Sequence, residues 1–269
     1  MTTGEGRDDL TCVVVPPSTD ILGLARSWFP EARWVTAPRS ADDLAALGRP
    51  LTGARFRGAG VTPTTVTGEL ELGSGTTLVG PTPLGEPDAA RFALPHAWQV
   101  HALHAPTPQT MGWLHAVARH TGGAVLADGA ITRPGMGACV NLRVSSARTL
   151  SAEESLRLVR RVTPRAVLVV SDEVGYLLEV PSSYDGSVLV DVRRAPDGVE
   201  HQFRWVSPTG EADDGEHHGA TSLDAIARER LVPVVARIAL RLLESVAGEA
   251  TDADGLIVTT AELERRAQR

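Results

Sequence analysis

The sequence contains no lysine, because all 26 of its basic residues are arginine. Lysine is ordinarily among the commonest residues. A P-loop uses a lysine to reach the phosphates, a protein kinase uses one on its third strand, and a Schiff base needs a lysine amine. The absence of lysine therefore excludes these three classes of enzyme. Two explanations of the absence stay open, namely drift in a GC-rich genome and avoidance of lysine-directed modification.

Cysteines and long apolar runs are also scarce. Cys12 and Cys139 are the two cysteines, and no CxxC spacing occurs, so neither a disulfide framework nor a zinc site is indicated. The longest apolar runs, such as residues 166–170, are far too short to cross a bilayer. The first nine residues are polar, unlike a signal peptide. We therefore expect a reduced, cytoplasmic protein with no membrane partner.

Positive charge is in the minority, since 33 acidic residues give a net charge of -7. A nucleic-acid partner requires a basic face, so we expect none. The sequence also has no GxSxG or HExxH motif, and the glycine-rich residues 133–137 lack the spacing of a dinucleotide-binding loop. We therefore expect no cofactor. Hydrophobic and charged fractions of 42% and 22% are typical of a soluble globular protein.

The fold prediction centres on residues 97–171, which contain six segments with clear boundary signals. In order they read strand, helix, strand, strand, helix and strand, at residues 98–105, 107–120, 124–127, 140–145, 151–162 and 166–170. This is the order of a ferredoxin-like β-α-β-β-α-β unit. The last segment, AVLVV, is continuously apolar, so it is predicted to be a buried strand. The prediction is an α+β fold with a ferredoxin-like centre.

Further elements flank this centre. Three strands at residues 175–180, 187–192 and 199–206, joined by polar turns, are predicted to extend the sheet as antiparallel strands. A long C-terminal helix follows at residues 222–247, and Pro233 is expected to kink or interrupt it. A linker-like stretch at residues 81–88 predicts a smaller α/β segment over residues 1–88 and an α+β domain over residues 89–269.

Four short segments support a resemblance. They are HAWQ at residues 96–99, GGAV at 122–125, LSAEE at 150–154 and DADG at 252–255. On these segments the chain resembles uncharacterised proteins of high-GC actinobacteria, over roughly its C-terminal two-thirds. The shared motifs are structural, so the resemblance implies a fold and a cytoplasmic setting but no activity.

Histidines offer the strongest candidate for chemistry. His96 and His104 are placed by strand parity on the same face, whereas His101 points to the opposite face. Asp128 follows a neighbouring predicted strand, so its carboxylate could meet the two imidazoles. The simpler interpretation is that these histidines lie at the edge of the core. The candidate catalytic set is therefore His96, His104 and Asp128.

Two functional hypotheses follow from these observations. The first is a non-enzymatic interaction or regulatory protein, which binds a protein partner or itself through its sheet or its long C-terminal helix. The second is a small-molecule enzyme or metal-dependent hydrolase that uses the His/Asp set. We favour the first, because the caps and turns are well specified and no catalytic motif is present.

Overall fold

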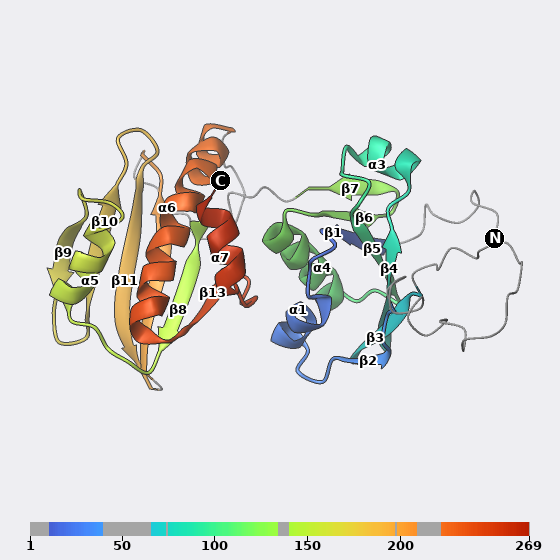
Figure 1. The fold of residues 1–269 in the computed structure, drawn as a ribbon, viewed down its shortest axis with the longest axis horizontal. Helices are drawn as coiled ribbons and strands as arrows, with labels where there is room; N and C mark the ends of the chain where they lie inside the picture. The colour runs from blue at the N-terminus through green and yellow to red at the C-terminus, as the bar shows by residue number, and fades with distance from the viewer. Residues whose placement is uncertain are drawn as a thin grey trace, which may run out of the picture. The chain divides into compact units, whose positions relative to one another are not determined.

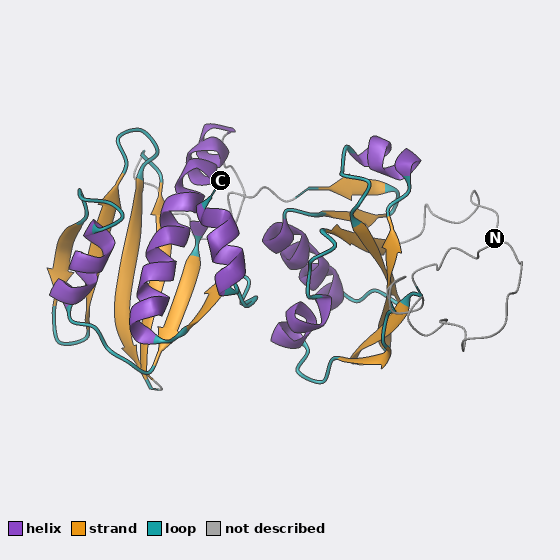
Figure 2. Ribbon diagram, in the orientation of Figure 1, coloured by secondary structure: helices purple, strands orange, loops and turns teal. Residues whose placement is uncertain are grey.

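The computed structural model describes residues 11–39, 66–73, 75–133, 140–196, 198–208 and 222–268. The chain divides into two compact units, Met1–Pro134 and Gly135–Arg269. Each unit contains one antiparallel sheet with helices packed against it, as Figures 1 and 2 show. The protein is therefore an α+β protein built on two separate sheets.

The first unit has a sheet in the order β2-β3-β4-β5-β1-β6-β7 over its described residues. Its elements are β1 (Thr11–Val15), α1 (Ile21–Trp28), β2 (Arg33–Thr36), β3 (Gly68–Gly73), β4 (Thr76–Pro83), α3 (Glu86–Phe92), β5 (Gln99–His104), α4 (Pro108–Thr121), β6 (Ala124–Ala127) and β7 (Ala130–Thr132).

Strand β1 lies at the centre of this unit, and all five of its residues are buried. Successive side chains of a strand point to opposite faces, so both faces of β1 must be covered. Cys12 and Val14 pack with Phe92 of α3 on one face. On the other face α4 packs against β1 and β6 and presents the fully buried Trp113, whose indole N–H donates to the Leu24 carbonyl at 3.2 Å.

The second unit has a sheet in the order β13-β8-β12-β11-β10-β9 over its described residues. Its elements are β8 (Leu142–Ser146), α5 (Ala152–Arg160), β9 (Val167–Ser171), β10 (Gly175–Pro181), β11 (Ser187–Ala195), β12 (Gly198–Val206), α6 (Ser222–Val246), β13 (Glu249–Asp252) and α7 (Thr260–Ala267).

The helices of the second unit lie over one face of its sheet (Figure 1). Alternate residues of β10, β11 and β12 are buried beneath them, in one core cluster with α6 and with Leu263 of α7. Trp205 and Phe203 are among the largest fully or almost fully buried side chains. This alternation is typical of a sheet with one covered and one open face.

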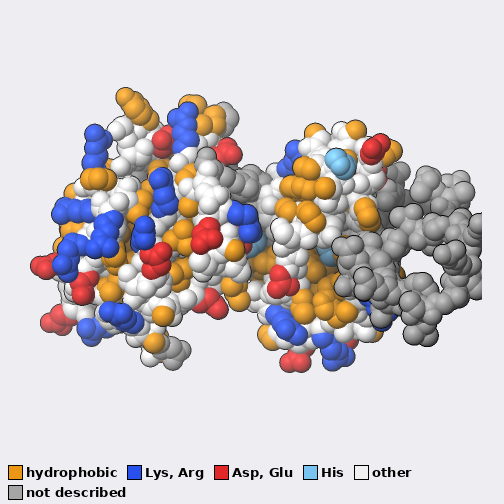
Figure 3. Space-filling model, viewed as in Figure 1, with side chains coloured by type: hydrophobic (Ala, Val, Ile, Leu, Met, Phe, Trp, Pro, Cys, Tyr) orange, Lys and Arg blue, Asp and Glu red, His pale blue; other side chains and the backbone are white. Residues whose placement is uncertain are grey.

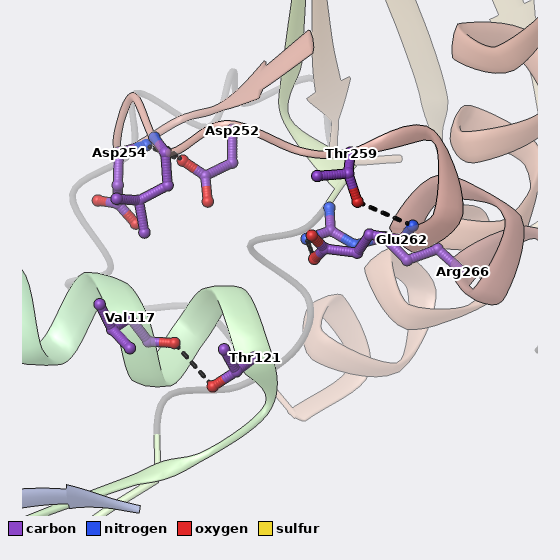
Figure 4. Close-up of polar contacts among 8 residues, drawn as sticks. Val117, Thr121, Asp252, Asp254, Thr259, Glu262 and Arg266 are labelled. Atoms are coloured by element: carbon purple, nitrogen blue, oxygen red, sulfur yellow. Dashed lines mark hydrogen bonds and ion pairs between the residues drawn. The ribbon is translucent and has the colours of Figure 1, made fainter. Parts of the chain in front are cut away.

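Capping contacts fix the starts of α5 and α7, and the long C-terminal helix predicted from the sequence is confirmed. At the start of α5, the Ser151 hydroxyl accepts from the Glu154 N–H, and the Glu154 carboxylate accepts from the Ser151 N–H at 2.9 Å. At the start of α7, the Thr259 hydroxyl accepts from the Glu262 N–H at 3.3 Å (Figure 4). The helix predicted at residues 222–247 is α6, and it continues through Pro233 without interruption.

The ferredoxin-like arrangement is not confirmed. All six predicted segments are present, but β5, α4 and β6 belong to the first unit, whereas β8, α5 and β9 belong to the second. In the first unit β1 lies between β5 and β6, and in the second unit β8 and β9 are separated by three strands. The division between the units falls at residues 134 and 135, whereas the boundary expected after Asp88 lies inside α3.

Candidate functional site

The three residues of the predicted catalytic set lie on the first unit and are exposed. Strands β5 and β6 both run antiparallel to β1, and Val13 pairs with His101 on one side and Val125 on the other. His104 and Asp128 therefore lie at the same end of the sheet, with their backbones two strand spacings, or about 10 Å, apart across the sheet. The other end of β5, at Gln99, is about 17 Å from His104 along the strand, and His96 precedes that end by three residues. This register does not assemble the three side chains.

No group of three or more His, Cys, Asp or Glu side chains that could hold a metal ion occurs within the described ranges. In those ranges, no helix has both the length and the apolarity needed to cross a membrane.

Three other histidines, His101, His120 and His201, are buried, and burial shifts the pKa of two of them. His101 is 2% exposed on the α4 face of the first sheet, and His201 is fully buried on β12 in the second unit. Burial lowers the pKa of His101 to about 4 and also lowers the pKa of His201. Both imidazoles are therefore neutral core groups without access to a solvent-borne substrate, and we assign them a structural role.

The most distinctive surface feature is β9, the edge strand of the second sheet. All five of its residues are exposed, and the side chains of Val167, Leu168, Val169 and Val170 are between 39% and 53% exposed. Within the described chain β9 pairs with β10 alone, so its outer edge carries backbone groups without a strand partner. The apolar run predicted to be buried is thus the most exposed strand of the second unit.

The other three sheet edges in the described part of the chain are protected in recognisable ways. Strand β2 carries Arg33, which forms an ion pair with Glu71 at 2.7 Å. Strand β7 has only three residues. Strand β13 carries Glu249 and Asp252 and is bridged on its free side by Ile257. Charges, short length and covering segments are the devices that keep strand edges from pairing with other chains. Strand β9 has no charged residue, and no segment among the described residues covers its edge.

Strand β9 has one irregularity. Its register with β10 shifts between Leu177 and Leu178, which leaves Val169 as an extra residue. Such a bulge increases the local right-handed twist of the edge. A strand that pairs with β9 must therefore be able to follow a twisted edge.

Opposite charges flank β9. Arg165 precedes the strand and is exposed, with its guanidinium donating to the Ser183 hydroxyl at 3.1 Å. Asp172 and Glu173 follow the strand. The Asp172 carboxylate accepts from the Gly175 and Val174 N–H groups at 2.9 and 2.8 Å, and these bonds hold its pKa below the usual range. Asp172 therefore forms the turn, and Glu173 is an exposed charge beside it.

A second surface feature is a groove of about 420 Å³ between the end of α5 and the middle of α6. It is lined by Arg161, Val162, Arg237, Leu240, Arg241 and Glu244. Arg241 donates to Glu244 at 2.8 Å, and Arg237 donates to the Pro233 carbonyl at 3.1 Å. Figure 3 shows the basic side chains gathered over α5 and α6. The groove therefore presents three guanidinium groups and one carboxylate.

The sequence predicts the position of β9 correctly, but it predicts a buried strand where the structure has an exposed one. The signal that identifies it is the absence of charge across an apolar run whose neighbours, Arg165 and Asp172, are charged. Comparisons of the chain with family models, with curated proteins and with solved structures find no match.

Proposed function

We propose that this protein is a non-enzymatic interaction protein that binds a polypeptide strand along the free edge of β9. The observation that carries the proposal is the exposure of four consecutive aliphatic residues, Val167 to Val170, on an edge strand without a charged residue. In strand addition, the backbone of the added strand supplies hydrogen bonds and its alternate side chains supply specificity.

The energetics of β9 favour this mode of binding. Each of the four aliphatic side chains is about half exposed, and full burial of such a side chain is worth about 1.5–3 kcal/mol. Covering the remaining half would therefore contribute about 1 kcal/mol for each side chain. The new backbone hydrogen bonds each add about 0.5–1.5 kcal/mol. A single added strand can therefore offset part of the cost of association.

The test compares two lysine substitutions at exposed valines of edge strands. Val169→Lys places a charge on β9, whereas Val35→Lys places the same charge on β2 of the first unit, where Val35 is 60% exposed. The full-length protein and both variants are used to capture polypeptides from a native cell extract, after circular dichroism confirms that each is folded. We expect the wild type and Val35→Lys to capture a polypeptide in stoichiometric amount, whereas Val169→Lys should not. The captured polypeptide can be another copy of this chain. Equal capture by all three proteins would contradict it.

The groove between α5 and α6 favours a second candidate function, which is the binding of an anionic ligand. Among the described residues neither Arg161 nor Arg237 has a carboxylate partner, so both guanidinium groups are available to an anion. Calorimetric titration with inorganic phosphate at low salt tests this candidate. Measurable binding by wild type that is lost in Arg161→Ala/Arg237→Ala would support it, and no heat of binding with wild type would reject it.

A further inference from the structure

Resting on the proposed function, we infer that the strand added to β9 is β9 of a second copy of this chain. In the resulting dimer the two strands run antiparallel, and the six described strands of each second-unit sheet join into one continuous sheet. The juxtaposition that supports this inference is an uncharged aliphatic edge with a positive charge at one end and negative charges at the other.

The charges select both the partner and the direction of pairing. Arg165 lies at the beginning of the strand and Glu173 beyond its end, four residues on either side of Val169. In an antiparallel pair centred on Val169, Arg165 of each copy approaches Glu173 of the other, so two favourable contacts form. In a parallel pair the like charges would meet instead. Opposite charges across paired strands stabilise a sheet and like charges destabilise it.

The bulge at Val169 also favours a second copy. A bulge increases the twist of the edge, and a partner strand with a different twist would pair along only part of it. A second copy of β9 has the same twist, because a two-fold axis relates two identical edges. The aliphatic run is likewise matched by an identical run, without a charge placed opposite an apolar side chain.

The size of the edge sets the strength of the dimer. Stable protein interfaces bury about 1,200–2,000 Å² in total, and a five-residue strand with its neighbouring charges offers an interface at or below the low end of this range. We therefore expect a reversible dimer with a dissociation constant on the order of 1–100 μM.

Sedimentation velocity of the full-length protein over about 1–300 μM is the test, with a chain mass of 28.5 kDa as the monomer reference. We expect the wild type and Val35→Lys to shift from monomer to dimer over this range, and Val169→Lys to remain monomeric. Arg165→Glu alone and Glu173→Arg alone should each weaken the dimer roughly tenfold, because two attractive contacts become repulsive.

The mixture of these two single variants provides the decisive control. When Arg165→Glu pairs with Glu173→Arg, both contacts are again between opposite charges, so the mixture should dimerise about as tightly as the wild type. Glu173 is chosen because Asp172 forms the turn through its hydrogen bonds. A β9-dependent dimer that the mixture does not restore would overturn the antiparallel arrangement.

The outcomes separate this inference from the proposed function. A wild type that stays monomeric, together with a different polypeptide whose capture is lost in Val169→Lys, would overturn the dimer but support strand addition at β9. A monomeric wild type with no capture that depends on Val169 would overturn both. A dimer that Val169→Lys does not weaken would overturn the assignment of β9 as its interface.

Discussion

The Nδ1 atom of His101 lies 2.5 Å from the position that a Cβ atom on residue 80 would occupy, so the imidazole fits beside β4 because residue 80 is glycine. The Val100 carbonyl oxygen lies only 2.9 Å from the same position. The backbone of β4 thus approaches β5 more closely than a side chain would allow. His101 occupies the space so created and is almost completely buried.

Gly80→Ala is therefore expected to destabilise the first unit by about 1–3 kcal/mol, the usual cost of overpacking a buried site. Urea unfolding measures the change. Gly112→Ala in α4 is the matched control, because its Cβ would meet the Trp28 ring at an ordinary 3.6 Å. Replacing a helical glycine in this way should stabilise the protein by about 0.5–1 kcal/mol. Equal effects of the two substitutions would show that the contact with His101 is unimportant.

The stability of the first unit should fall in acid because of His101. The pKa of His101 is about 4 in the folded protein, since burial disfavours the charged imidazole, and about 6.5 in an unfolded chain. The unfolded state therefore binds more protons between these two values. Stability from this residue is fully present above pH 6.5 and is lost as the pH falls toward about 4, by about 3 kcal/mol in total.

Urea midpoints at several pH values between 4 and 7.5 measure this dependence. His101→Leu removes the titrating group and should flatten the pH dependence of the first unit over this range. Burial also lowers the pKa of His201, so the stability of the second unit should likewise decrease as the pH falls. A variant whose pH dependence matches that of the wild type would contradict the role given to His101.

In the second unit, the guanidinium carbon of Arg228 lies 4.6 Å from the centroid of the Trp205 ring. Arg228 is only 7% exposed, so this cation–π contact is largely shielded from water. The Trp205 indole N–H also donates to the Asp185 carbonyl at 2.8 Å, which fixes the ring. The contact connects the beginning of α6 to β12.

A double-mutant cycle with Arg228→Met and Trp205→Leu should give a coupling energy of about 1–2 kcal/mol in urea unfolding. Each single variant removes one partner, so their effects should add up to more than the loss in the double variant. Effects that add within about 0.3 kcal/mol would indicate that the two side chains pack without a specific attraction.

The sequence was sufficient to locate most helices and strands, because their signals are local. The cap of α5 depends on Ser151 and Glu154, three residues apart, and the end of α4 depends on Gly122, which adopts a positive φ of 70°. Such contacts lie within one turn of the chain and are specified by neighbouring residues.

The arrangement of the strands was less predictable, because pairing joins distant segments. Val14 pairs with Val100 on one side and with Ala124 on the other, and nothing in the local pattern around β1 indicates these partners. The order of the six segments along the chain favoured a single ferredoxin-like sheet. The placement of β5 and β6 in one sheet and of β8 and β9 in another excludes that arrangement.

Local sequence patterns also did not predict two features of the candidate sites, namely the exposure of β9 and the separation of the histidines. A continuous apolar run is typical of a strand buried on both faces, but β9 has this pattern and lies at a sheet edge. For the histidines, strand parity correctly separated His101 from His104, since the first is buried and the second exposed. Parity compares only the faces of a strand. The eight residues between His96 and His104 place these two side chains at opposite ends of an extended segment, and the parity argument did not take that distance into account.

The central claim is that the edge of β9 becomes paired when the protein associates. Hydrogen–deuterium exchange of the full-length protein, measured at about 5 and 300 μM, tests it directly. We predict slower exchange of the Val167–Ser171 amides at the higher concentration, with no change for Arg33–Thr36 of β2. Exchange in β9 that is equally fast at both concentrations, in a sample that dimerises, would contradict the account.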